Sequence, residues 1–173
     1  MKTNMNRKGI SNVVATIILI AVAIALAVAI AVWVFGLAGS ASKTATLQIQ
    51  AVGLNGTAAA ASSSGGTAYL SLLVSNPSSA AIGINGFTLG SLSCVFSSPI
   101  SVPAGTQGEL LVIALTGSSG NFTGVNAIYL GGSQLSISAT CSGKQAAQVG
   151  VQYSGYVTTV SGQTYPFTVT ATS

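Results

Sequence analysis

Histidine is absent from this chain of 173 residues, and aspartate and glutamate together occur once, as Glu109. Charged residues make up 3% of the sequence, whereas an average soluble domain has about 25%. General acid–base catalysis and oxygen-ligand metal sites draw mainly on His, Asp and Glu. One chain therefore offers no carboxylate pair, no catalytic triad and no His-containing metal cluster. The composition predicts a protein that is not an enzyme and has no catalytic residue, cofactor or metal site.

Basic residues are also few, and they are unevenly placed. Lys2, Arg7 and Lys8 lie close to the N-terminus, and only Lys43 and Lys144 follow. A nucleic-acid interface needs clustered Lys and Arg to neutralise phosphates, so we expect no nucleic-acid partner. Most of the chain is nearly neutral.

A long apolar segment follows the basic residues. Val13 to Phe35 run for 23 residues with Thr16 as the only polar one, and a helix of that length spans about 30 Å of hydrocarbon. Residues 21–32 alternate alanine with larger apolar residues, a period typical of strands. A lone strand in lipid would leave its backbone groups unsatisfied, so we predict a helix. The basic residues before it indicate that the leader stays cytoplasmic and the rest lies outside.

The alanines of this segment recur at helical spacing, which lets helix axes approach closely. They form two sets whose members are four residues apart: Ala21, Ala25 and Ala29, and Ala23, Ala27 and Ala31. The segment is either an ordinary membrane anchor with incidental alanines or a helix that packs against copies of itself. A conventional cleaved signal peptide would have a shorter apolar core.

From Ser40 onward the chain is rich in Ser, Thr, Gly and β-branched residues. Leu47, Ile49 and Ala51 alternate with polar residues, as do Tyr165, Phe167, Val169 and Ala171. Further short apolar runs cover 69–74, 110–115 and 128–137. Turn signals separate them at 64–66, 76–77, 85–86, 103–105, 117–120, 131–132 and 161–162. Short strands at this spacing predict an antiparallel sandwich or barrel rather than a disordered stalk.

The predicted fold class is α+β: a long N-terminal apolar α-helix followed by an all-β antiparallel sandwich head of immunoglobulin-like type. We expect a basic leader over 1–9, the apolar helix over 10–40 and the head over 41–173.

The first forty residues resemble the archaeal type IV pilins. Arg7-Lys8-Gly9 followed by Ile10-Ser11-Asn12 and an apolar run is similar to the junction of a class III signal peptide. The resemblance implies that a prepilin peptidase cuts between Gly9 and Ile10, with Lys8 in its recognition sequence. Many relatives have proline where Asn12 stands, so the chain departs from the pattern there. Beyond residue 40 the resemblance is one of architecture only.

This resemblance implies a pilin, the structural subunit of an extracellular pilus on the cell surface that mediates adhesion. The expected partners are copies of itself in a helical homopolymer, the prepilin peptidase and pilus assembly machinery, and the membrane before assembly. Two alternatives remain: a subunit of the archaellum, the motility filament, and a single-pass anchored surface protein that binds a partner and never polymerises.

Two further features fit an extracellular location. Cys94 and Cys141 are the only cysteines, and an oxidising compartment favours a disulfide between them over two buried thiols. Asn55 and Asn121 begin Asn-X-Thr glycosylation sequons, whereas Asn76 is followed by proline. Because Ser and Thr replace ionisable side chains, we also expect stability to change little in acid.

Overall fold

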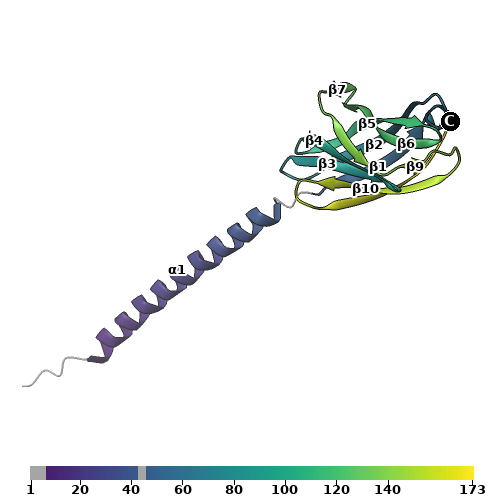
Figure 1. Cartoon of the computed structure of the whole chain (residues 1–173). Coiled ribbons are helices and arrows are strands. Elements are labelled where there is room, and N and C mark those ends of the chain that lie inside the picture. Colours follow the sequence, from purple (N-terminus) through teal and green to yellow (C-terminus); the bar gives the residue numbers. More distant parts are fainter. Residues whose placement is uncertain (1–6, 43–45) are drawn as a thin grey trace, which may run out of the picture. The chain divides into compact units, whose positions relative to one another are not determined.

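The computed structural model describes residues 7–42 and 46–173. The chain divides into two units, Met1–Lys43 and Thr44–Ser173, close to the expected boundary at residue 40. The first unit contains one helix, α1 (Arg7–Ser42), seen as the long coil in Figure 1. It begins three residues before the predicted start and ends two after the predicted end. The Gly9–Ile10 junction therefore lies inside helical backbone, while residues 1–6 of the predicted leader are outside the described residues.

The second unit is an antiparallel sandwich, as predicted, with its two layers visible in Figure 1. Sheet A has the order β1-β2-β5-β6-β7, with β9 also paired to β6, and sheet B has the order β11-β10-β3-β4-β8. The strands of sheet A are β1 (Gln48–Asn55), β2 (Gly66–Asn76), β5 (Thr106–Ser118), β6 (Asn121–Leu130), β7 (Ser133–Leu135) and β9 (Gln145–Ala146). Those of sheet B are β3 (Ile82–Leu89), β4 (Leu92–Val102), β8 (Ala139–Ser142), β10 (Gln152–Thr159) and β11 (Thr164–Thr170).

Seven of these strands follow the order of an immunoglobulin-like sandwich. In sheet A, β1, β2 and β5 take the places of strands A, B and E, and in sheet B, β11, β10, β3 and β4 take those of G, F, C and C′. The segment β6–β9 is inserted between the equivalents of strands E and F. It adds a hairpin, turned at Gly131 and Gly132, and the edge strand β8.

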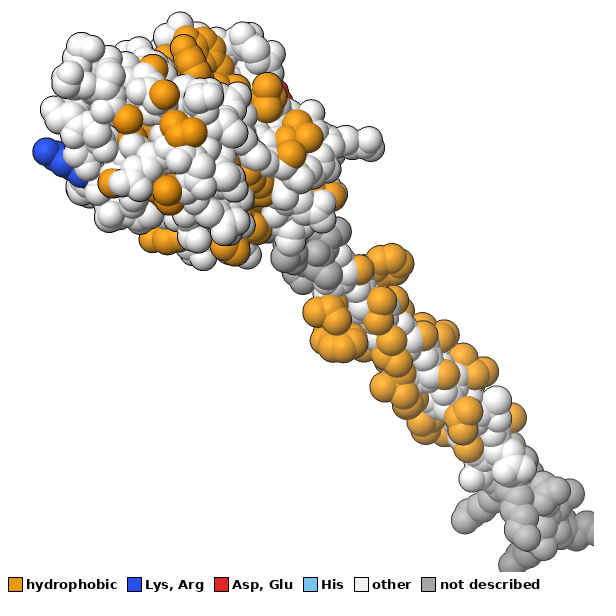
Figure 2. Space-filling view, turned by 90° about the vertical axis from the view of Figure 1, so that its right-hand side faces the viewer, with side chains coloured by type: hydrophobic (Ala, Val, Ile, Leu, Met, Phe, Trp, Pro, Cys, Tyr) orange, Lys and Arg blue, Asp and Glu red, His pale blue; other side chains and the backbone are white. Residues whose placement is uncertain are grey.

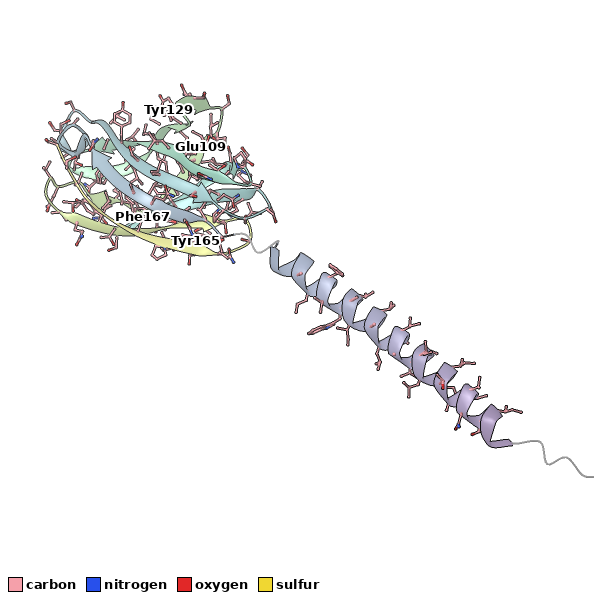
Figure 3. All side chains as sticks on the ribbon, turned by 180° about the vertical axis from the view of Figure 1, so that it is seen from behind. Glu109, Tyr129, Tyr165 and Phe167 are labelled. Carbon is pink, nitrogen blue, oxygen red and sulfur yellow. A yellow bond between two sulfur atoms is a disulfide. The ribbon has the colours of Figure 1, made fainter. Side chains whose placement is uncertain are left out.

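The core lies between the sheets and is made by alternate residues. Leu70, Leu72 and Val74 of β2 face it, as do Leu111, Ile113 and Leu115 of β5, Phe87 of β3 and Phe167 of β11. Figure 3 places Glu109 and Tyr129 in the layer of sheet A and Tyr165 and Phe167 in the layer of sheet B. As predicted, Phe167, Val169 and Ala171 are buried while the intervening threonines are exposed.

One predicted turn is absent, one is confirmed and one element was not predicted. Asn85 and Gly86 form no turn but lie inside β3, where the register shifts between Ile84 and Gly86. The turn expected at Gly131-Gly132 is present and divides the apolar run 128–137 between β6 and β7. The short helix α2 (Thr57–Ala61) was not foreseen. It lies over Gly66 and Gly117, which are register partners on β2 and β5.

One seam joins the two sheets, where Leu54 of β1 forms a parallel bridge with Ala171, just after β11. There the Thr172 N–H donates to the Leu54 carbonyl at 2.8 Å, and the Thr57 N–H donates to the Thr172 carbonyl at 3.1 Å. Within sheet B, the Ser97 N–H donates to the Ser138 carbonyl at 2.8 Å, which extends the β4–β8 pairing by one residue.

Candidate assembly site: the apolar helix and the sandwich surface

Helix α1 is apolar over most of its length. Ile10–Ala38 form a candidate membrane span of 29 residues, within which an 18-residue window has a mean hydropathy of 3.2. At about 1.5 Å per residue this segment is about 44 Å long, more than the ~30 Å hydrocarbon core requires. The helix is therefore long and apolar enough to cross a membrane.

The hydroxyl of the one polar residue inside the apolar run is hydrogen-bonded within the helix. Thr16 donates its hydroxyl to the Asn12 carbonyl, with 2.8 Å between the oxygens. This bond back to the preceding turn is available in any solvent. Thr16 therefore does not interrupt the apolar surface of α1.

The apolar surface extends around the whole circumference of α1. Every side chain from 10 to 38 is exposed in the single chain, and Figure 2 shows hydrophobic atoms along the described helix. Seventeen of these side chains are large and apolar, among them Leu19 at 72% exposure and Phe35 at 77%. At about 1.5 kcal/mol each, burying them is worth about 25 kcal/mol, which exceeds the ~5–15 kcal/mol net stability of a typical domain. A helix of this kind needs a surrounding that is not water.

Over residues 21–31, small and large side chains form separate stripes on α1. At about 100° per residue, each predicted alanine set occupies an arc of about 80°, and the two arcs are centred about 160° apart. The first arc holds Ala21, Ala25 and Ala29, and the second holds Ala23, Ala27 and Ala31. The larger residues fill the arcs between: Val22, Leu26 and Ile30 on one side, and Ile24 and Val28 on the other, and Val32 closes the first alanine arc at its C-terminal end. The helix thus has two shallow grooves on nearly opposite sides, each flanked by ridges.

The expected processing residues lie at the beginning of α1. Lys8 and Gly9 are helical in backbone, and the side chain of Lys8 is outside the described residues. Ile10 is 69% exposed.

The predicted disulfide is present in the sandwich. Cys94 of β4 and Cys141 of β8 are direct register partners with Cα atoms 4.0 Å apart, and their sulfur atoms are bonded. Cys94 is buried and Cys141 is half-buried. The bond fixes the edge strand β8 to sheet B.

The two sequons lie at the same end of sheet A, but their surroundings differ. Asn55 is exposed at the end of β1, and its Oδ1 accepts a hydrogen bond from the Thr172 hydroxyl at 2.7 Å. The hydroxyl-bearing residue of that sequon, Thr57, is completely buried, and its Oγ1 has no hydrogen-bond partner. Asn121 begins β6 and is half-buried, and Thr123 of its sequon is half-buried too.

Sequence reasoning missed one buried polar cluster. Asn76 is fully buried, and its Nδ2 donates to the carbonyls of Ala80, Val102 and Pro103 at 2.8–3.1 Å. Its Oδ1 accepts hydrogen bonds from the N–H and the hydroxyl of Ser78. Asn76 therefore joins the β2–β3 loop to the end of β4. An Asn-Pro pair directly after an apolar run was the available signal.

The sandwich surface carries almost no charge. In Figure 2 its visible face is mostly uncoloured with scattered hydrophobic side chains and very little blue or red. Within the part of the chain that the structure describes, no three His, Cys, Asp or Glu side chains come together as a metal site would need.

Fold and surface together define a class: an apolar helix joined to an uncharged, disulfide-linked antiparallel sandwich. No protein-family model matches the chain, and comparison with curated proteins gave no match.

Proposed function

We propose that this chain is the structural subunit of an extracellular filament related to the archaeal type IV pilins. In the filament, α1 helices of many copies pack into a common core and the sandwiches form the outer layer. The observation that supports this most is the unbroken apolar circumference of α1, which requires cover on all sides.

The two alanine arcs favour neighbouring α1 helices over lipid as the final surroundings of α1. Close approach through small residues on one side is enough for a helix dimer. Two arcs on nearly opposite sides allow a neighbour on each side, and a contact that repeats without closing generates an open helical polymer. The driving force is burial and close packing of apolar surface.

In this proposal the new chain first crosses the membrane through α1, with its basic leader on the cytoplasmic side. A prepilin peptidase then cuts between Gly9 and Ile10. This bond lies in the first turns of α1, where helices fray and where Gly9 lowers helix propensity by about 1 kcal/mol. The assembly machinery transfers α1 from lipid to its sister helices, and the filament serves adhesion at the cell surface.

Electron microscopy of filaments sheared from cells, with N-terminal sequencing of the chain in them, tests this proposal. We expect fibres whose subunit begins at Ile10. Recovery only from membranes, with residues 1–9 retained, would support an anchored binding protein instead. Loss of swimming but not of attachment in a strain lacking this chain would indicate the archaellum alternative.

A pair of variants tests the packing argument. Ala25→Leu combined with Ala27→Leu fills one position in each groove, so we expect membrane insertion to persist and fibres to be lost. Ile24→Leu, a volume-conserving change on a ridge between them, is the matched control and should leave fibres intact. Fibres of normal yield from the double alanine variant would contradict close packing of α1.

A further inference from the structure

The outer faces of the two sheets differ in chemistry. On sheet A, outward residues include Tyr69, Leu73, Leu110 and Val112, which are exposed or half-buried. On sheet B, the residues alternating with the buried core set are mostly Thr and Ser. We define these as the hydroxyl face: Thr88 of β3, Ser93 and Val95 of β4, Thr140 and Ser142 of β8, Gln152, Ser154, Tyr156 and Thr158 of β10, and Thr164, Pro166, Thr168 and Thr170 of β11.

Strand register arranges the hydroxyl face in rows that cross all five strands of sheet B. One row runs Pro166–Tyr156–Thr88–Ser93–Ser142, and the next runs Thr164–Thr158–Gly86–Val95–Thr140. Neighbouring strands lie about 4.8 Å apart, and same-face residues along a strand about 6.8 Å. Seven of the ten residues in these rows carry a hydroxyl, which can both donate and accept a hydrogen bond, and Pro166, Gly86 and Val95 lie between them.

An aromatic ring lies within this array. Tyr156 is 44% exposed and lies in register between Pro166 and Thr88. Its backbone N–H donates to the Thr88 hydroxyl at 3.1 Å, so Thr88, at 9% exposure, helps to position Tyr156. The face therefore combines an apolar ring with surrounding hydroxyls.

The absence of charged side chains on the hydroxyl face excludes most classes of partner. None of its residues is Asp, Glu, Lys, Arg or His, and so it has no charge complementarity to nucleic acid, anionic lipid or a charged peptide. A neutral polysaccharide matches it: sugar hydroxyls pair with Ser and Thr hydroxyls, and the C–H face of a pyranose ring packs on tyrosine.

We propose that the hydroxyl face of sheet B is a binding surface for neutral polysaccharide, centred on Tyr156. This inference deepens the proposed adhesion role by assigning the chemical class of the adhesion target and the sheet that binds it. Each copy contributes one weak site, and a polymer of such copies binds with avidity.

Retention of the full chain, in mild detergent, on cellulose, chitin and cross-linked dextran particles tests the proposal. We expect retention on at least one of them, unchanged between about 0.05 and 1 M salt because no charges are involved, and no preference for sulfated dextran. Tyr156→Ala should lower retention at least about tenfold. Thr158→Val combined with Thr164→Val, which removes two adjacent hydroxyls and keeps their shape, should lower it about fivefold.

Tyr69→Ala is the matched control, because Tyr69 is 46% exposed on the outer face of sheet A. Equal loss with Tyr69→Ala, retention on none of the three neutral particles, or retention abolished by salt would overturn the proposal. Sugars attached to Thr158 or Thr164 in native material would also overturn it, since they would cover the face. Circular dichroism checks that each variant folds. Electron microscopy of the same variants scores fibre formation separately, so a failure of assembly is distinguishable from a failure of binding.

Discussion

Cys94 and Cys141 lie directly opposite each other on β4 and β8, and their disulfide joins residues 47 positions apart in the sequence. In the chain-entropy model, closing a loop of this length stabilises the fold by about 4 kcal/mol. Replacing both cysteines by alanine should lower the free energy of unfolding of the sandwich by about that amount. Urea unfolding with and without reductant checks this. Equal midpoints for the variant and the oxidised protein would contradict it.

The side-chain amide of Asn76 should be hard to replace. Asn76→Ala removes the amide donor to three carbonyls and the acceptor of the Ser78 N–H, and we expect a loss of about 2–4 kcal/mol. Asn85→Ala, in a half-buried position on β3, is the control and should cost much less. Thermal unfolding of both variants decides between these expectations.

A carboxyl at position 76 should create a pH dependence. In Asn76→Asp the ionised group would face three carbonyl oxygens, which raises its pKa above the unfolded value of about 3.9. A raised folded pKa means that stability is highest below the unfolded value and falls as pH rises through the folded one. The variant should therefore melt at a higher temperature at pH 3 than at pH 7, and the opposite order would refute this account.

The unmodified protein should hardly respond to acid. Glu109 is the only carboxylate side chain, so few protons can be taken up differently by folded and unfolded chains between pH 7 and pH 2. We expect circular dichroism of the sandwich to be unchanged over this range. A cooperative unfolding transition near pH 4 would show that an unrecognised group controls stability.

The packing of α2 against β2 and β5 requires two glycines, Gly66 and Gly117. A Cβ at Gly117 would lie 2.3 Å from the Ala60 carbonyl oxygen, and one at Gly66 would lie 2.4 Å from that of Ala59. Gly117→Ala should displace α2 and lower stability by about 1–3 kcal/mol. Gly53→Ala meets no atom within 4 Å and is the control, with an expected change within about 1 kcal/mol in the stabilising direction. Denaturant unfolding compares the two.

The two sequons should differ in when they accept a glycan. Thr57 is buried in the folded sandwich whereas Thr123 is partly accessible, so Asn55 is open to modification only before folding. Glycopeptide mass spectrometry of native material should find Asn121 occupied at least as often as Asn55. Modification of refolded, unglycosylated protein at Asn55 but not at Asn121 would be the contrary result.

Much of the fold could be predicted because each layer repeats a simple pattern. The 23-residue apolar run defined α1, and the alternation from Tyr165 to Ala171 defined β11 with the correct buried face. The same reasoning failed at β1, where Ala51 was expected beside Leu47 and Ile49. A register shift after Ile49 turns Ala51 outward, so Val52 and Leu54 face the core instead. Such bulges depend on pairing with a distant strand, which local alternation does not contain.

The two candidate sites also differ in how much of each could be predicted from the sequence. The four-residue spacing of the alanines was evident from the sequence, and the arcs follow from it because the segment is a helix. That these alanines pack against other helices stays a prediction. The hydroxyl face requires knowing that β10 lies between β3 and β11 and which residues are in register. Tyr156 and its register partner Thr88 are 68 positions apart in the sequence, so only long-range packing brings them together.

The bond from Thr172 to the Leu54 carbonyl spans 118 positions in the chain. Strand β1 comes early in the sequence, yet the hydrogen bonds that close the sandwich beside its last residues come from Thr172. Because a polypeptide is made from its N-terminus, this side of the sandwich can close only after the last strand, β11, has been synthesised.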